Sequence, residues 1–519
     1  MITVSEAWKD IQQRFILPEG HLEITCAITE EGIQGDVSIS AANEAFFSNL
    51  ANTLDMSAQD GAEKYATNEL NLWALDGSKA ILPDSGPYGT GYVGETDGAG
   101  SVTLALPEVH TVAIPGVTII WSGAPEEIPA VFTVTAKNGE TVVAETTITE
   151  NTDRVSIVDL ELANYDSVTI TVHEWRLPYR RARIDKAALG HILTLSKSEI
   201  LSYTHEQHGE LNSGELPKNS IEFSLDNIDG RWNPSNPVGM EKYLSERQKV
   251  TARYGLNVNG TIEWINAGVF YLSEWRAPSN GLEAMFTARD VFEYLLTTPY
   301  TGRQTGTLRE IVEDAFSVAG VPADVKVVLA DRLGTYSATI PSEGESKPTC
   351  AEIVQMCANA ACCVIRQDRA GALHIEPLNT ADSGYLVPAS LSYSHPEVEL
   401  SKQLKNVSVS YGENLSYVLG VGASGETQTV SNPLVADEAQ AAEIAAWVRD
   451  TLEPRRSVSG EYRADPRLDL FDIVKVESKY GVISPVAITN IKYTFGGAFA
   501  GSYTGRVISE EGYLARAGN

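Results

Sequence analysis

The chain has 519 residues, of which 43% are hydrophobic and 21% charged, and its formal net charge is −30. The composition is typical of folded protein, and the length predicts three or four domains. The excess of acidic residues disfavours binding to nucleic acid or to an anionic membrane, since both need a positively charged surface. No apolar run approaches the roughly 18 residues that span a bilayer. The N-terminal MITVSEAWKDIQQRF lacks the apolar core of a secretory signal, so we expect a soluble chain made in a cytoplasm.

Residues 1–68 are predicted to hold an N-terminal helix followed by strands. HLEITCAI (21–28) has the residue pattern of a strand, and so does NELNLWAL (68–75), at the boundary with the next predicted domain. LDGS (75–78) predicts a turn, because Asp and Gly favour turn conformations.

Residues 69–178 are predicted to form a β-sandwich. From about residue 100 the chain is a series of short segments: VTIIWS, AVFTVTA, TVVAETTI, RVSIVDLEL and SVTITVHEW. KNGE (137–140) predicts a hairpin turn, because Asn-Gly accepts the positive φ values that a two-residue loop needs. Short strands at this spacing predict a sandwich of about a hundred residues.

Three aromatic residues of this sandwich are candidates for stacking on a sugar ring: Trp121, Tyr165 and Trp175. Trp121 and Trp175 lie in apolar strands, where packing in the core is the favoured interpretation. Tyr165 lies in LANYDSV, a predicted loop, and is expected to be more accessible. Sugar binding by these residues therefore stays open.

Residues 179–300 follow a basic cluster, RLPYRRARI (176–184), and are predicted to form a first tube-like β-barrel. In SIEFSLD, Ile221, Phe223 and Leu225 share one face, and Glu222, Ser224 and Asp226 share the other. KVTARYG, GVFYLSEW and LEAMFTARD continue in the same manner. One apolar and one polar face per strand is what a small barrel or a half-solvated sheet requires.

The stretch SLDNIDGRWNPSNP (224–237) contains the oxygen-rich residues from which calcium loops are built. Counted from Asp226, however, glycine arrives at position 5 rather than 6, and position 12 is Pro237, which has no carboxylate. We interpret the stretch as a turn that ends a strand, with Gly230 supplying a positive φ and the Asp and Asn side chains bonding to nearby backbone.

Residues 301–388 are predicted to form a small α+β domain. TLREIVEDAFSVAG has Thr307 and Glu310 at capping-box spacing, and Gly320 ends the predicted helix. TCAEIVQMCANAA repeats the device with Thr349 and Glu352. CCVIRQDRAGALHIEPL then predicts a hairpin that turns at residues 369–371.

Residues 389–519 are predicted to form a second tube-like β-barrel. Val407, Val409 and Tyr411 share one face of LKNVSVSYG, a helix is predicted at 436–453, and DIVKVES, SPVAITNIKYTF and GSYTGRVI are strands. VTARYG (250–255) and VSVSYG (407–412) end alike, which agrees with two barrels of one type. The predicted class is therefore mainly β and multidomain.

Catalytic and metal sites are disfavoured. HEQHGE (205–210) spaces its histidines by three rather than the four of the helical zinc motif, and a solvated loop is favoured. Four of the five cysteines, Cys350, Cys357, Cys362 and Cys363, lack any C-x-x-C pair and are interpreted as reduced core residues. No nucleophile elbow or phosphate-binding glycine loop is present. The sequence predicts no enzyme, no cofactor and no metal.

Two stretches together resemble a known family. The first is LPKNSIEFSLDNIDGRWNPSNPVGMEKYLSERQKVTARYG, followed by AGVFYLSEW and FTARDVFEYL; the second is VSNPLVADEAQAAEIAAWV, followed by YRADPRLDLFDIVKVESKYG and ITNIKYTFGGAFAGSYTGR. Their order and spacing over residues 179–519 are similar to those of the baseplate hub or tail-tip hub proteins of tailed bacteriophages. YATNELNLWALDGS and the sandwich that follows resemble a galactose-binding-type domain.

The resemblance implies two tube-like barrels separated by an α+β unit, and a homotrimer whose six barrels form a ring in the virion tail. It implies as neighbours a tail tube or distal tail protein, a tape measure protein, and a fibre, spike or receptor-binding protein. Such a hub is assembled in the bacterial cytoplasm and forms part of the DNA ejection conduit. No peptidase or muramidase domain follows the second barrel, so cell-wall cleavage is not expected. The resemblance implies scaffold roles for Asn432, Pro433, Asp465, Pro466, Gly496 and Gly497.

Two other functions remain alternatives. A host-surface glycan adhesin would act through the sandwich, with the barrels as its mount. An acidic glycoside hydrolase, the less favoured alternative, would need two carboxylates about 5 to 9.5 Å apart across a cleft; the 69 acidic residues guarantee accidental pairs.

Overall fold

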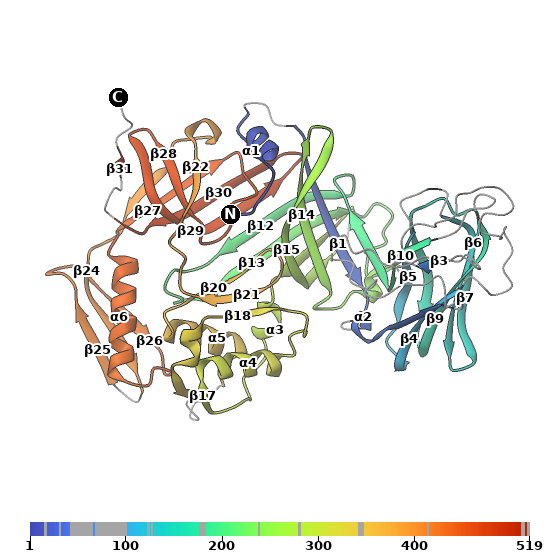
Figure 1. Ribbon diagram of the computed structural model, residues 1–519, viewed down its shortest axis with the longest axis horizontal. Helices are drawn as coiled ribbons and strands as arrows, with labels where there is room; N and C mark the ends of the chain where they lie inside the picture. The colour runs from blue at the N-terminus through green and yellow to red at the C-terminus, as the bar shows by residue number, and fades with distance from the viewer. Residues whose placement is uncertain are drawn as a thin grey trace. The chain divides into compact units, whose positions relative to one another are not determined.

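The computed structural model describes residues 1–14, 18–30, 33–41, 66–67, 101–121, 125, 128–175, 183–236, 239–278, 282–340, 347–412, 415–509 and 514–515. The chain divides into two compact units: unit 1 comprises residues 1–24, 195–230 and 250–519, and unit 2 comprises residues 25–194 and 231–249. Most regular structure in both units is strand, which confirms the predicted mainly β, multidomain class (Figure 1). No helix in the described ranges is long and apolar enough to cross a membrane.

Unit 2 is a β-sandwich of two antiparallel sheets. One sheet has the order β3 (Ala66–Thr67), β10 (Arg183–Leu189), β5 (Ile114–Trp121), β8 (Val155–Leu162). The other has the order β2 (Ser38–Ala41), β4 (Ser101–His110), β9 (Tyr165–Trp175), β6 (Pro129–Asn138), β7 (Thr141–Ile148). Alternate apolar residues of β5, β8 and β10 share one buried core with those of β4, β6 and β9, as a period-two pattern requires. The predicted strand at 68–75 and the predicted turn at 75–78 lie outside the described residues.

The predicted hairpin at 137–140 joins β6 to β7. Asn138 pairs with Thr141, so Gly139 and Glu140 form the two-residue loop. Gly139 has a φ of 57°, and its backbone N–H donates to Asp166 Oδ2 at 2.7 Å. The turn is confirmed, with its positive φ on the glycine alone.

One continuous sheet runs through unit 1. Its strands follow the order β1 (Gly20–Ile28, of which 20–24 belong to this unit), β14 (Lys249–Val258), β15 (Thr261–Arg276), β16 (Glu283–Arg289), β13 (Lys218–Asp226), β12 (Ile200–His208), β29 (Gly481–Phe495), β30 (Phe499–Val507), β27 (Arg456–Tyr462) and β23 (Glu397–Leu400). β28 (Ile473–Ser478) pairs with β29 and with β22 (Asp382–Val387). The strands of the two predicted barrels are thus joined edge to edge by the antiparallel pair β12 and β29, in which His205 lies opposite Tyr493.

The predicted α+β elements are present. Capping boxes at Thr307 and Thr349 begin α4 (Leu308–Ala319) and α5 (Cys350–Ala360), and Gly320 ends α4 with a φ of 71°. Both boxes confirm the sequence interpretation. The predicted hairpin is β20 (Val364–Gln367) with β21 (Leu373–Glu376), and β18 (Val327–Leu329) pairs with β21 in parallel.

The predicted helix near 436–453 is α6 (Glu438–Leu452), which packs on the sheet β25 (Leu415–Gly420), β24 (Leu404–Tyr411), β26 (Glu426–Ser431). Val407 and Val409 of β24 are buried with α4, α5 and α6 in one apolar core. The two strands that end alike, VTARYG and VSVSYG, belong to different sheets, since β14 lies in the large sheet and β24 in this one.

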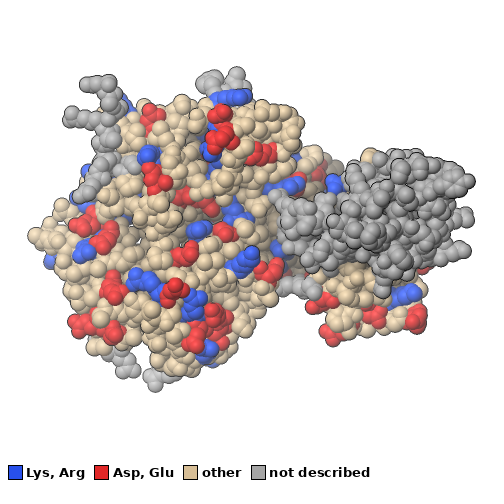
Figure 2. Space-filling view, viewed as in Figure 1, with Lys and Arg blue, Asp and Glu red and all other residues tan. Residues whose placement is uncertain are grey.

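Shorter elements complete the described structure. They are α1 (Glu6–Gln12), α2 (Ile33–Asp36), α3 (Phe292–Leu295), β11 (His191–Leu195), β17 (Thr305–Thr307), β19 (Ser337–Thr339) and β31 (Leu514–Ala515), with 3-10 turns at 241–243, 331–334 and 389–391. On the face of unit 1 drawn in Figure 2, acidic and basic side chains are interspersed.

Candidate functional site

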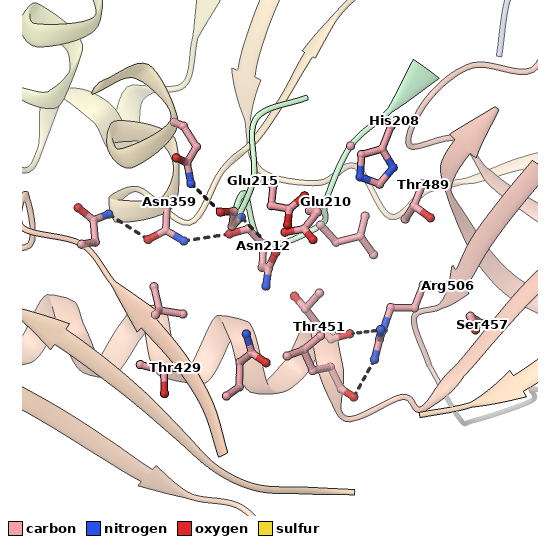
Figure 3. A pocket seen from close by; sticks show the side chains of 18 of the residues that line it. His208, Glu210, Asn212, Glu215, Asn359, Thr429, Thr451, Ser457, Thr489 and Arg506 are labelled. Atoms are coloured by element: carbon pink, nitrogen blue, oxygen red, sulfur yellow. Dashed lines mark hydrogen bonds between the residues drawn. The ribbon is translucent and has the colours of Figure 1, made fainter. Parts of the chain in front are cut away.

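A polar cavity of about 480 Å³ lies in unit 1 (Figure 3). It is lined by three regions of the unit: the first predicted barrel, the α+β region, and the C-terminal region from residue 389 onward. His208 at the end of β12 and the loop that follows it, residues 209–215, form one wall, α5 contributes another, and residues of β26, α6, β27, β29 and β30 form the rest. Glu215, Thr429 and Ser431 are exposed, so the cavity is reached from solvent.

Side-chain amides hold the three walls together. Asn432, which precedes α6 and is almost fully buried, donates from Nδ2 to the carbonyl of Met356 at 2.8 Å and to Asn359 Oδ1 at 2.9 Å. Asn359 in turn donates to the carbonyl of Asn212 at 2.9 Å. Gln355 donates to the carbonyls of residues 213 and 214. Because buried amides are costly when unpaired, this ladder fixes the relative positions of the walls.

The loop side of the cavity is acidic. Glu210 is half-buried, and burial, followed by the neighbouring Glu215 carboxylate, raises its pKa. The nearby His208 and the backbone N–H groups of residues 214 and 215 oppose this rise in pKa. Among the described residues, no Lys or Arg lies within ion-pairing distance of either carboxylate. Two carboxylates that share a wall without a cation repel each other, which favours binding of a positive group between them.

The opposite side carries Arg506 of β30. Its Nε donates to the carbonyl of Thr451 at 3.1 Å, and its Nη2 to those of Leu452 and Pro454, both at 3.1 Å. These carbonyls lie at the C-terminal end of α6, where a cation is favoured by the helix dipole. Burial lowers the pKa of Arg506. No carboxylate of the described chain forms an ion pair with this guanidinium, and none of its hydrogen bonds uses Nη1.

Buried polar side chains also gather elsewhere in unit 1, around His205 of β12 and around Arg369. His205 is 0% exposed; its Nδ1 lies 2.7 Å from the hydroxyl of Tyr254, and its Nε2 lies 2.9 Å from Asn219 Oδ1. Arg369, at the turn between β20 and β21, donates to the carbonyls of Pro466 and Leu468. Burial, followed by the Arg369 cation, lowers the pKa of His205 to about 4, so this imidazole is neutral near pH 7.

A second cavity, of about 620 Å³, is lined by Arg369 and by residues of β20, β21 and the segment 469–473. His374 of β21 lines it, with Nε2 at 3.0 Å from Asp368 Oδ2 and Nδ1 at 3.1 Å from Glu376 Oε2. The hydrogen bond to Asp368 raises the pKa of His374. Only the protonated imidazole can donate to both carboxylates at once. Asp368 Oδ1 also accepts the N–H groups of Ala370 and Ala372, so this group stabilises the hairpin.

Two of the three predicted sugar-stacking residues are enclosed. Trp121 is fully buried; its Nε1 donates to Ser156 Oγ at 2.8 Å, and its ring packs edge-on against Phe132. This confirms the core interpretation for Trp121. Tyr165 is also 0% exposed, so the expectation that it is accessible was wrong. Tyr165 is the first residue of β9 rather than part of a loop, and its ring points into the sandwich core. The Trp175 side chain lies outside the described residues, and sugar binding by the sandwich stays a prediction.

The expected solvated loop at HEQHGE was also wrong. Residues 205–208 belong to β12, which pairs with β13 on one side and β29 on the other, so His205 points into the core. The interpretation of residues 224–237 as a turn is confirmed over the described part: Asp226 Oδ1 accepts the N–H of Ile228 at 3.1 Å, and Gly230 has a φ of 70°. Pro237 lies outside that part.

The structure also locates the four clustered cysteines, which lie in the core as predicted, and several of the residues with implied scaffold roles. Cys350, Cys357, Cys362 and Cys363 are free and buried, and burial raises the pKa of Cys362 to about 11. Asp465 is buried and accepts two hydrogen bonds from Arg467 Nε at 2.9 and 3.0 Å. Gly496 and Gly497 form the turn between β29 and β30. No group of three or more His, Cys, Asp or Glu side chains in the described part of the chain could hold a metal ion.

The sequence did not predict the polar residues that line the 480 Å³ cavity. Glu210, Asn359 and Arg506 come from segments far apart in the chain, and no local spacing connects them. Asn432 was singled out by resemblance, but its partners follow from the packing of α5 against α6.

No family model and no curated protein matches the chain. Among solved structures, it is similar to the 43 kDa tail protein of prophage MuSo2 from Shewanella oneidensis, at 12% identity and a TM-score of 0.43 over 62% of this chain and 95% of that one. It is similar to a tail protein from Neisseria meningitidis MC58, at 11% identity and a TM-score of 0.42 over 63% and 95%. Prophage tail protein gp18 from Listeria monocytogenes EGD-e gives 10% identity and a TM-score of 0.39 over 61% and 91%. These are partial similarities and assign the chain no activity.

Proposed function

We propose that the chain is a structural protein of a phage tail, and that its residues 179–519 form a trimeric hub at the tail tip or baseplate. In this role it extends or closes the tail tube, belongs to the DNA ejection conduit, and connects the tube to a spike or receptor-binding fibre. The proposal rests on the resemblance of residues 179–519 to hub proteins and on features of unit 1 that suit a ring subunit.

The main structural observation in favour of a ring assembly is an exposed sheet edge. β23 is the last strand of the large sheet, and among the described strands it pairs with β27 alone. Its Val398 and Leu400 side chains are 42% and 58% exposed. An unpaired, partly apolar edge strand invites pairing with another chain unless it is covered. A closed ring of subunits would cover it.

Buried contacts between the regions of unit 1 support a role as a rigid subunit of a conduit. β12 and β29 join the two barrel regions into one sheet, and Arg369 ties the α+β region to the loop at 466–468. A subunit built in this way resists relative movement of its parts, which a conduit under mechanical load requires. The formal charge of −30 suits a wall that a polyanion passes without binding.

The mass of the purified chain, measured by light scattering across a dilution series, tests the proposal. A stable species of three chain masses is expected, because a closed cyclic assembly fixes its own stoichiometry. Replacing both Val398 and Leu400 by Lys is expected to produce monomers. Val112→Lys is the matched control, since Val112 is 51% exposed but lies in the loop between β4 and β5. A monomer at every concentration in the unaltered chain would count against the ring.

A further inference from the structure

The 480 Å³ cavity has oppositely charged sides that do not neutralise each other. Glu210 and Glu215 lie on the loop side, and Arg506 lies across from them (Figure 3). Hydroxyl and amide side chains line the space between, among them Asn212, Thr489 and Thr504. A solvent-accessible polar cavity of this size can take water or a ligand with complementary charges.

Arg506 is only partly used by the fold. Its contacts with the end of α6 occupy Nε and Nη2, whereas a guanidinium has five N–H donors. The two N–H groups of Nη1 take part in none of these bonds. A carboxylate is the group that an arginine fork binds best, and it would also offset the cost of burying this cation.

The side of the cavity formed by Glu210 and Glu215 favours a cationic group of a ligand. Burial and the proximity of Glu215 both disfavour the charged form of Glu210. An ammonium or guanidinium group between the two carboxylates would relieve their repulsion. The same ligand can reach both sides, because the cavity is continuous and has the size of sites that take small organic ligands.

We propose that this cavity binds a short zwitterionic peptide, whose carboxylate pairs with Arg506 and whose cationic group lies between Glu210 and Glu215. The chemistry is shared by two sources, a free peptide with charged termini and an internal segment of a partner protein with one acidic and one basic side chain. The site is independent of the trimeric ring, so it can be present or absent whatever the assembly state.

Calorimetric titration of the full chain at pH 7.5 with triglycine tests this proposal. We expect saturable binding that weakens at least about tenfold when the peptide is N-acetylated or C-amidated, since each cap removes one charged contact. Arg506→Gln is expected to weaken triglycine by a similar factor but to leave the weak binding of the C-amidated peptide unchanged. The double variant Glu210→Gln with Glu215→Gln should also weaken the binding of triglycine, but it should leave the weak binding of N-acetyl-triglycine unchanged. Lys492→Gln, which removes an exposed cation of β29 outside the cavity, is the control.

Because Arg506 also supports the end of α6, Arg506→Lys serves as a second variant that keeps the charge. It should retain more binding than Arg506→Gln, while the near-ultraviolet circular dichroism stays unchanged.

The capped peptide acetyl-Lys-Gly-Asp-amide distinguishes the two sources of the ligand. Binding tighter than that of triglycine assigns the site to a protein segment, and weaker binding assigns it to a free peptide. Absence of saturable binding of both peptides up to about 10 mM, or equal binding of capped and uncapped triglycine, would overturn the proposal.

Discussion

Arg369 Nε lies 3.5 Å from Asp469 Oδ1, and both side chains are almost entirely withdrawn from solvent. Asp469 Oδ1 also accepts a hydrogen bond from Gln207 Nε2 at 3.1 Å. The three residues come from the β20–β21 turn, the loop before β28, and β12. The buried Asp469 carboxylate of the C-terminal region therefore contacts both the first predicted barrel, through Gln207, and the α+β region, through Arg369.

Removing one member of this pair is expected to be costly. Asp469→Asn leaves the buried Arg369 cation without its counter-charge, and loss of one partner of a buried pair typically costs about 3–5 kcal/mol. Chemical denaturation should show this loss in the unfolding of unit 1. Asp450→Asn is the control, because Asp450 pairs with Arg449 at the surface, where such pairs contribute about 1 kcal/mol or less. Equal effects of the two changes would show that the buried pair is not a structural link.

The pH dependence of stability should reveal His205. Its pKa is about 4 in the folded chain, lowered by burial and by Arg369, against about 6.5 when unfolded. Between these values the unfolded state binds a proton that the folded state does not, so stability is lost as the pH falls from about 6.5 to 4. The loss is roughly 3 kcal/mol. His205→Gln removes it, and the difference between variant and parent curves should be flat above pH 7.

Asp290 should act in the opposite direction. Burial raises its pKa to about 8 although its Oδ1 accepts the N–H of Phe292. The folded state therefore holds a proton that the unfolded state has lost above about pH 4, so stability falls as the pH rises from about 4 to 8. Between pH 4 and 6.5 this slope opposes that of His205. Between pH 6.5 and 8 Asp290 contributes a fall of roughly 2 kcal/mol.

Asp290→Asn tests this directly, because an amide keeps a hydrogen-bond acceptor for Phe292 and does not titrate. Relative to the parent chain, the variant should gain stability from pH 6.5 to 8 in equilibrium denaturation. An unchanged slope over that range would mean that the Asp290 carboxyl is ionised in the folded chain.

Local features were predictable from the sequence because short-range chemistry decides them. The Thr307 and Thr349 capping boxes and the Gly139 turn each depend on residues within a few positions of one another. In β13, by contrast, Ser224 of the predicted polar face is buried as well. The cavity was not predictable, because Glu210, Asn359 and Arg506 meet only through tertiary packing. His205 and Tyr165 were misplaced for a related reason: a polar-looking segment can still be a central strand when partners on both sides bury it.

The two capping boxes should contribute separately measurable stability. In each, a Thr hydroxyl accepts the N–H of the third helical residue and the Glu carboxylate accepts the Thr N–H. Thr307→Ala and Thr349→Ala are each expected to cost about 1 kcal/mol. Thr305→Ala, an exposed residue two positions before the first box, should be nearly neutral. Hydrogen exchange at the first turns of α4 and α5 would localise the effect, and faster exchange throughout unit 1 instead would contradict a local cap.

Tyr165 allows a prediction that also bears on sugar binding. Its buried hydroxyl has no hydrogen-bond partner among the described residues, and an unsatisfied buried polar group costs about 1–3 kcal/mol. Tyr165→Phe should therefore stabilise unit 2 by about 1 kcal/mol, as measured by thermal or chemical unfolding. Tyr493→Phe is the matched control in unit 1, because the Tyr493 hydroxyl lies 2.8 Å from the carbonyl of Leu468, and the change should destabilise.

If Tyr165→Phe instead destabilises the chain, the hydroxyl has a partner such as water in solution. Tyr165→Ala would open a cavity in the core at a cost of about 3–5 kcal/mol. Loss of sugar binding in that variant would follow from unfolding of the sandwich and would not identify a binding residue. The phenylalanine variant keeps the core intact, so glycan binding that survives in it removes the Tyr165 hydroxyl from any sugar contact.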